Sequence, residues 1–351
     1  MTTSPNIGIH MHSYPGSWRD ELTSVASQGV TVIRMDTNWN VLQEDPGDTA
    51  FDPNTLLLNE TEYGEYLVAR GYTLNGNERL AWVVDDIRVA LEQGIEVIYN
   101  FGVTPYWADN TTVSYLPDDP QLAADFFYDL IIYMARQDDG QALLDGIVGW
   151  QFFNEVNNPA KNIENPDAGR DHFDLYLQSA ALAQQRIGEA YANISSHLGW
   201  NASAALYAPT FAGVYEPDLL ARAASYDGFT LNALTLHPYG PVVDAWNYGG
   251  EEWRHGDNPT YHKQIRPTED IFTWRAEVNR YSNDGLELYG EGIDEALWNK
   301  NAEVGLERSL AELYGRQGID ADALSILFTE WGAPTITPPG DPSQRRHFLY
   351  R

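Results

Sequence analysis

Two glutamates stand at the ends of two apolar runs, and they are the residues of this sequence best placed to do chemistry. Glu155 follows Trp150-Gln-Phe-Phe-Asn154, and Glu330 follows Ile326-Leu-Phe-Thr. Each run is typical of a buried strand, and a carboxylate at the mouth of a strand is costly to desolvate unless something there uses it. Two such carboxylates that meet at one edge of a parallel sheet could flank and cleave a glycosidic bond, one as the acid and one as the carboxylate.

Short apolar strands alternate with amphipathic helices along the chain, as in repeated βα units. The predicted strands are Asn6–His12, Thr31–Asp36, Glu96–Phe101, Ile147–Phe153, Ala205–Pro209, Ala233–His237 and Ser325–Thr329. The predicted helices include Trp18–Ser27, Arg79–Glu92, Leu122–Arg136, Phe173–His197 and Asn301–Gly315. The alternation predicts an α/β fold of the (β/α)8 TIM-barrel type. A doubly wound open sheet is the rival, but it would need a phosphate loop, and the sequence has no GxGxxG or Walker pattern.

The readable strands stop at seven. After Glu330 the sequence offers one loop and the start of a seventh helix, Pro342–Arg351. Because a barrel unit takes about 30 residues, we expect the C-terminal βα unit to be missing. The sequence leaves open whether a longer chain, another chain or a rearranged N-terminal segment fills the gap. An open strand edge would favour self-association.

The domain organisation follows from the same pattern. We expect residues 1–351 to form a single catalytic barrel with a long insertion at about 241–300, after the sixth strand. That insertion is rich in Trp, Tyr, Asp and Glu and reads as a loop or small subdomain that shapes the substrate site.

The two glutamate motifs resemble those of the clan A glycoside hydrolases, in the style of families 39 and 5, and the similarity runs from about Ile7 to Gly332. Asn154-Glu155 is similar to the Asn-Glu signature after strand four, which implies that Glu155 is the acid/base. The run from Thr329 to Gly332 is similar to the strand-seven motif, which implies that Glu330 is the nucleophile. The resemblance implies retaining hydrolysis of β-glycosidic bonds in an oligo- or polysaccharide, with no cofactor.

Polar residues near these motifs are candidates for substrate binding. The amide of Asn154 can bond a sugar 2-hydroxyl, a contact that strengthens in the transition state. Period-two alternation in the second strand places Arg34 and Asp36 on one face. An inward arginine needs a carboxylate partner. The resemblance implies that this partner is Glu330, and a structural pair with Asp36 is the alternative.

Aromatic and histidine side chains complete the expected site. Trp107 and Trp331 are candidate platforms for the apolar face of a sugar ring, although core packing is the usual role of tryptophan. His237 and Tyr239 end the sixth strand. The resemblance implies that Tyr239 donates to Glu330 and that His237 contacts substrate, and a structural role for His237 is the alternative.

Two other classes of function are alternatives. His10 and His12 lie at i and i+2 on the first strand and could bind zinc, as in amidohydrolase barrels. Strand four lacks the lysine and strand five the histidine of that class, so His12 and His10 are better read as lining the sugar pocket. The other class is a carbohydrate-binding barrel without activity.

The composition limits the partners and the compartment. The chain has 51 acidic and 21 basic residues and a net charge of −30, so nucleic acids and anionic membranes are poor partners. It contains no cysteine, which excludes disulfides and thiolate metal sites. The sequence shows neither a signal peptide nor a run of about 18 apolar residues, which favours the cytoplasm. Lys161, Lys263 and Lys300 are the lysines. An acidic, lysine-poor chain is typical of a halophilic protein, with an ordinary acidic enzyme as the alternative.

We expect the stability of the protein to rise with salt. A net charge of −30 produces self-repulsion, and at about 1 M salt the Debye length falls to about 3 Å, which screens it. The measurement is the thermal unfolding midpoint between about 0.05 M and 3 M KCl. A midpoint that stays level or falls would contradict salt adaptation.

Overall fold

The structure is a computed structural model that describes residues 8–12, 18–43, 45–47, 50–72, 76–108, 116–154, 156, 172–212, 217–237 and 325–328. The chain divides into two compact units. The first comprises Met1–Thr210 and Ala223–Leu234, and the second comprises Phe211–Arg222 and Thr235–Arg351. Each unit is described by itself.

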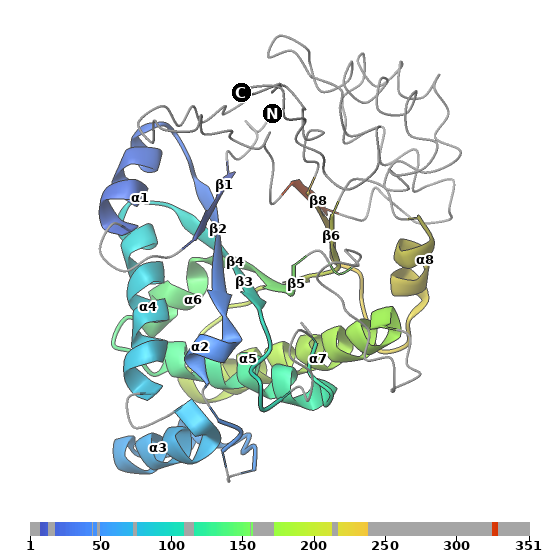
Figure 1. The fold of residues 1–351 in the computed structure, drawn as a ribbon. Coiled ribbons are helices and arrows are strands. Elements are labelled where there is room, and N and C mark those ends of the chain that lie inside the picture. The colour runs from blue at the N-terminus through green and yellow to red at the C-terminus, as the bar shows by residue number, and fades with distance from the viewer. Residues whose placement is uncertain are drawn as a thin grey trace, which may run out of the picture. The chain divides into compact units, whose positions relative to one another are not determined.

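The first unit is built on a parallel five-stranded sheet with the order β1-β2-β3-β4-β5 (Figure 1). The strands are β1 (Gly8–His12), β2 (Val32–Asn38), β3 (Glu96–Gly102), β4 (Ile147–Phe152) and β5 (Leu206–Tyr207). Neighbours in the sheet are also neighbours in sequence. Helical connections between them are what parallel pairing requires, because the chain must return to the same end of the sheet.

Helices of different lengths connect these strands, and the last helix, α8, follows the sheet and lies between residues 212 and 233. They are α1 (Trp18–Ser27), α2 (Trp39–Leu42), η1 (Thr55–Leu57), α3 (Glu60–Leu67), η2 (Val68–Tyr72), α4 (Gly76–Glu92), α5 (Pro120–Ala135), α6 (Gly140–Asp145), α7 (His172–Leu198) and α8 (Pro217–Ser225). Local chemistry fixes several starts. Asn59 and Glu62 form a capping box at α3, and Asp119 caps α5 ahead of Pro120.

A second, three-stranded sheet has the order β6-β7-β8, from β6 (Thr210–Ala212), β7 (Ala233–His237) and β8 (Ser325–Phe328). All seven predicted strands are present, with ends shifted by at most two residues. The sequence did not predict β6 or several short helices. The missed helices are α2, α3, α6 and α8. The predicted helix 301–315, the insertion 241–300 and the start of a seventh helix lie outside the described residues. The missing eighth unit and the single-barrel organisation therefore stay predictions.

An aromatic layer fills the space between the sheet and the helices. The Phe101 ring of β3 stacks on Phe126 at 4.7 Å and lies 4.9 Å from Phe127, both on α5. Phe152 of β4 stacks on Tyr176 of α7 at 5.8 Å. Helix α5 in turn packs along α7. Since rings of this size contribute the largest buried areas, this layer is the main source of core stability on that face.

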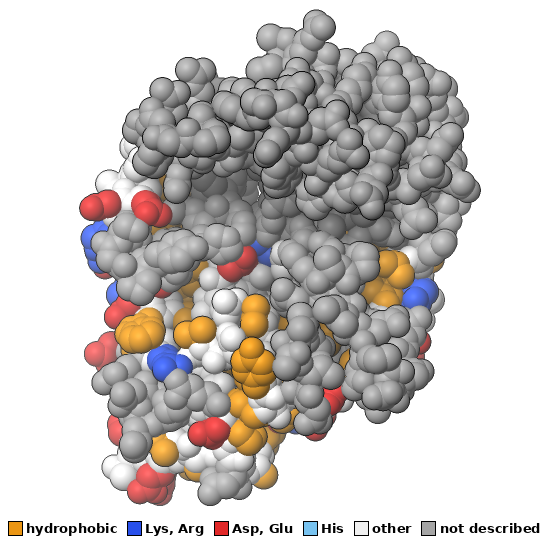
Figure 2. All heavy atoms as spheres, viewed as in Figure 1, with side chains coloured by type: hydrophobic (Ala, Val, Ile, Leu, Met, Phe, Trp, Pro, Cys, Tyr) orange, Lys and Arg blue, Asp and Glu red, His pale blue; other side chains and the backbone are white. Residues whose placement is uncertain are grey.

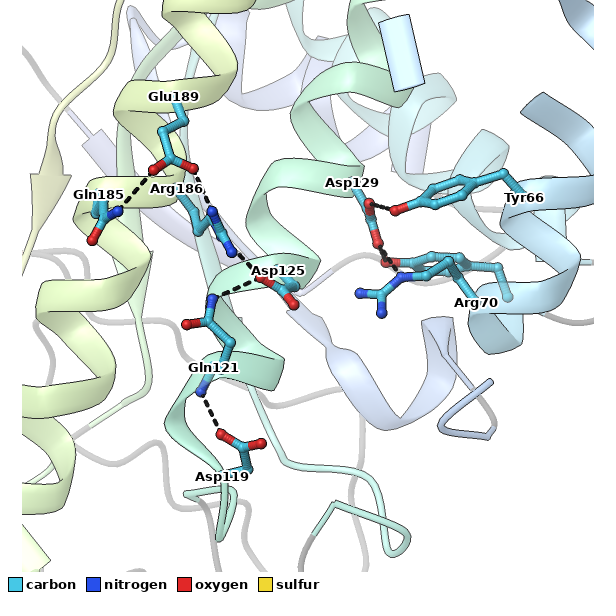
Figure 3. A network of polar contacts seen from close by, with 10 residues as sticks. Tyr66, Arg70, Asp119, Gln121, Asp125, Asp129, Gln185, Arg186 and Glu189 are labelled. Carbon is cyan, nitrogen blue, oxygen red and sulfur yellow. Dashed lines mark hydrogen bonds and ion pairs between the residues drawn. The ribbon is translucent and has the colours of Figure 1, made fainter. Parts of the chain in front are cut away.

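A buried ion cluster ties α3 and η2 to α5 (Figure 3). The carboxylate of Asp129 is 1% exposed and accepts bonds from the Tyr66 and Tyr72 hydroxyls at 2.9 Å and from Arg70 Nε at 3.1 Å. Burial raises the pKa of Asp129, and the adjacent Arg70 opposes that rise. The π-helical η2 carries both Arg70 and Tyr72, so the irregular turn supplies two of the three donors.

The turn η2 also depends on glycine. Gly71 has φ +83°, and a Cβ there would lie 1.9 Å from the Asp45 carbonyl oxygen. Any other residue would both strain the backbone and collide with the loop after α2. This close approach holds the loop against η2, which donates two hydrogen bonds to the ion cluster.

The described surface carries acidic side chains around its edge with a few basic ones between them (Figure 2). Within the described residues, every helix is too short or too polar to span a bilayer.

We expect Asp129→Leu to lower the free energy of unfolding by about 3–5 kcal/mol, because it leaves the buried Arg70 charge without its carboxylate. The measurement is the urea unfolding midpoint. Asp138→Leu, at an exposed position just beyond α5, is the control and should change stability little. Equal effects of the two substitutions would contradict the assigned role of the cluster.

Candidate active site

One polar layer crosses the five-stranded sheet near the carboxyl ends of its strands. Strand register aligns His12 with Asp36, Asp36 with Asn100, Asn100 with Gln151, and Gln151 with Tyr207. Every position in this row carries a polar group, although the strands themselves are rich in apolar residues. Polar side chains gathered at the carboxyl edge of parallel strands are what a site of the barrel type requires.

Arg34, two residues before Asp36 on β2, contacts this layer with its side chain. Its side chain is 2% exposed, and Nε donates to Gln151 Oε1 while Nη2 donates to Asn154 Oδ1 at 2.8 Å. Nη1 lies 3.1 Å from Asp36 Oδ1. A guanidinium group can make all three contacts at once because its donors are held in one plane. Arg34 therefore joins the ends of β2 and β4.

The contact with Arg34 also orients the Asn154 amide. An arginine only donates hydrogen bonds, so the amide must turn its oxygen toward Arg34. The Nδ2 group is then the end directed away from Arg34. As a hydrogen-bond donor it suits a hydroxyl oxygen of a ligand.

The sequence did not indicate two further polar residues of the site, Asn100 and Gln151. They are 3% and 0% exposed. Asn100 Oδ1 and Gln151 Nε2 are buried without a hydrogen-bond partner among the described residues. The available signal was a single polar residue between large apolar neighbours in each strand, Tyr99-Asn100-Phe101 and Trp150-Gln151-Phe152.

Trp107 follows β3 and is anchored at its edge. Its Nε1 donates to the Gln43 carbonyl oxygen at 3.2 Å, and its ring meets the buried Trp39 ring edge-on at 5.6 Å. The Gln43 side chain is itself fixed, since its Oε1 accepts from Trp39 Nε1 and its Nε2 donates to the Arg70 carbonyl oxygen, both at 2.7 Å. Trp107 remains half-buried, so part of the ring is available for contact.

The side chains of the remaining predicted site residues are outside the described part of the structure. Glu155, Glu330, Tyr239 and Trp331 lie outside the described residues. His12 and His237 are described through their backbone, as the last residues of β1 and β7. Of the two partners expected for Arg34, Asp36 is in contact, and the amides of Gln151 and Asn154 are further partners that the sequence did not predict.

Comparison with known proteins identifies the fold. The chain is similar to the solved structure of a beta-xylosidase from Caulobacter crescentus CB15, with 15% identity, a TM-score of 0.54 and coverage of 94% of this chain and 53% of that chain. It thus spans about half the length of that protein. Neither a family model nor a curated protein sequence matches it.

Other similar solved structures are also glycoside hydrolases. The beta-glycosidase BGL167 has 14% identity, a TM-score of 0.45 and coverage of 91% of this chain and 76% of that chain. A family 30 subfamily 8 xylanase from Clostridium acetobutylicum has 15% identity, a TM-score of 0.39 and coverage of 68% and 51%. The resemblance to glycoside hydrolases predicted from the sequence is confirmed at the level of the fold, by the match to the beta-xylosidase.

We expect Arg34→Lys to destabilise the protein by about 1–3 kcal/mol, because one ammonium group cannot serve three separated acceptors and leaves a buried amide oxygen unpaired. The measurement is chemical unfolding. Arg19→Lys is the control, because Arg19 pairs with Glu92 on the surface, where both side chains are about half exposed. A loss no larger at Arg34 than at Arg19 would contradict the assigned contacts.

Proposed function

We propose that this protein is a retaining glycoside hydrolase that cleaves β-glycosidic bonds in an oligo- or polysaccharide. The observation that carries the proposal is the Arg34–Asn154 contact, which fixes an amide donor at the end of β4, one residue before Glu155. The fold shared with a beta-xylosidase supports the class of reaction. The experiment below identifies the sugar, the linkage and the mode of attack along a chain.

The mechanism assigned here uses two glutamates. Glu330 attacks the anomeric carbon, the bond to the leaving oxygen breaks, and Glu155 gives that oxygen its proton. A water then loses a proton to Glu155 and attacks the anomeric carbon, which breaks the ester to Glu330 and releases the sugar with retained configuration. The reaction needs no cofactor.

Neighbouring residues bind the sugar. The Asn154 amide donates to the 2-hydroxyl, and Arg34 holds that amide in place. Trp107, anchored through its indole nitrogen, is a platform for a sugar ring. By the resemblance of its motif, Tyr239 donates to Glu330 and His237 contacts substrate. His12 lines the sugar pocket, and Trp331 is a second platform for a sugar ring.

The test of the proposal is a screen of aryl β-glycosides and polysaccharides at low and high salt, followed by substitution of the glutamates. Glu330→Gln should abolish turnover without loss of folding. Glu155→Gln should slow substrates with poor leaving groups most, by about 10²–10⁴-fold. Azide should restore activity to Glu155→Ala on activated aryl glycosides, because it can replace water without general-base help.

Glu96→Gln is the matched control, since Glu96 is exposed at the opposite, amino end of β3. It should retain wild-type rates. A crystal structure should place the carboxyl groups of Glu155 and Glu330 about 5–5.5 Å apart. Wild-type rates in both site variants would refute the enzyme assignment. Sugar binding without turnover would favour a binding protein, and loss of activity on chelation alone would favour the His10/His12 zinc alternative.

A further inference from the structure

The side chains of β4 alternate regularly until the strand ends. Trp150 and Phe152 face the helices, because Trp150 Nε1 donates to the Tyr191 hydroxyl of α7 at 3.1 Å and the Phe152 ring stacks on Tyr176 of α7. Gln151, between them, faces the opposite side of the sheet and accepts from Arg34. This is the period of two expected of a strand.

The alternation breaks at Phe153. A continued strand would send Asn154 to the helix side with Phe152, two residues before it. Instead Asn154 accepts from Arg34, on the same side of the sheet as Gln151. The residue at which the side changes is Phe153, which has φ +58°. A left-handed backbone is uncommon for a residue other than glycine, and here it reverses the parity of the chain.

Packing holds Phe153 in this conformation. Its backbone N–H donates to the Phe101 carbonyl oxygen of β3 at 2.7 Å. Its ring is 1% exposed, with the Phe152 ring 4.5 Å away and the Phe101 ring 5.9 Å away. The side chain is thus buried in the aromatic layer while the backbone turns. Strain of this kind persists where the surroundings over-determine it, and it gathers at functional sites.

We propose that Phe153 is a positioning residue, whose left-handed turn brings the Asn154 amide onto Arg34. Its meaning for catalysis rests on the glycosidase function proposed above. Its structural part, that Phe153 decides the side on which Asn154 lies, stands apart from that function.

The test compares leucine with isoleucine at two adjacent positions. The two side chains have the same size and polarity, but isoleucine is branched at Cβ and tolerates a left-handed backbone poorly. At Phe153, the Ile variant should therefore have a lower kcat/KM than the Leu variant. At Phe152, which is equally buried but extended, the Ile variant should have a kcat/KM equal to that of the Leu variant, because strands favour β-branched residues.

We expect kcat/KM of Phe153→Ile to be about tenfold below that of Phe153→Leu, as the strain of a branched residue in this region predicts. In an Asn154→Ala background the same two substitutions should differ by less than about twofold, since their effect passes through Asn154. A purely structural role would leave the difference unchanged in that background, and such a result would overturn the proposal.

Crystal structures of both variants test the structural part without any assay of turnover. Phe153→Leu should keep the Arg34 Nη2–Asn154 Oδ1 hydrogen bond, and Phe153→Ile should lose it. Retention of that bond in Phe153→Ile would overturn the proposal. Should that variant fail to fold, Phe153→Val takes its place against Phe153→Leu, and the same pair at Phe152 measures the effect of the missing methylene. A wild-type protein inactive on every glycoside would refute the proposed function, while the crystal structures would still decide the role of Phe153.

Discussion

A buried guanidinium group governs the carboxyl edge of the five-stranded sheet. Arg34 lies in the core side of β2 with 2% of its surface exposed, and a charge in that position is stable only if its donors are met. The acceptors are Asp36 on β2 itself, Gln151 on β4 and Asn154 just after β4. Two members of the polar row, Asp36 and Gln151, thus bind one cation, and the chain turns after β4 so that Asn154 can reach it as a third acceptor.

The sequence predicted the parts of this arrangement that follow from regular geometry. Period-two alternation put Arg34 and Asp36 on one face, and the apolar runs located β2, β3 and β4 within two residues. It missed Gln151 and Asn100 as site residues, because each is a lone polar residue in an apolar run. A residue-by-residue parity count along β3 and β4 would have found both.

The conformation of Phe153 lies beyond such a count. Nothing in Trp150-Gln-Phe-Phe-Asn154 marks a left-handed residue, and the predicted strand therefore ran through Phe153. Val103, just after β3, also has a positive φ of +54° despite its branched side chain. In both cases contacts from distant segments hold the left-handed backbone. The Phe153 N–H donates to the Phe101 carbonyl oxygen, and the Asn40 N–H donates to the Val103 carbonyl oxygen. Tertiary contacts here override local preference, and they do so at adjacent strand ends of the candidate site.

The same demand for multivalent donors explains a bias in composition. Of the 21 basic residues only three are lysines. The described arginines act as cross-links, as when Arg136 bonds the Leu58 carbonyl oxygen and Glu60, or Arg186 bonds Asp125 and Glu189. A planar group with five donors satisfies several acceptors for one positive charge, which an ammonium group cannot do. These described arginines therefore bind several acceptors for each positive charge, at places where segments meet.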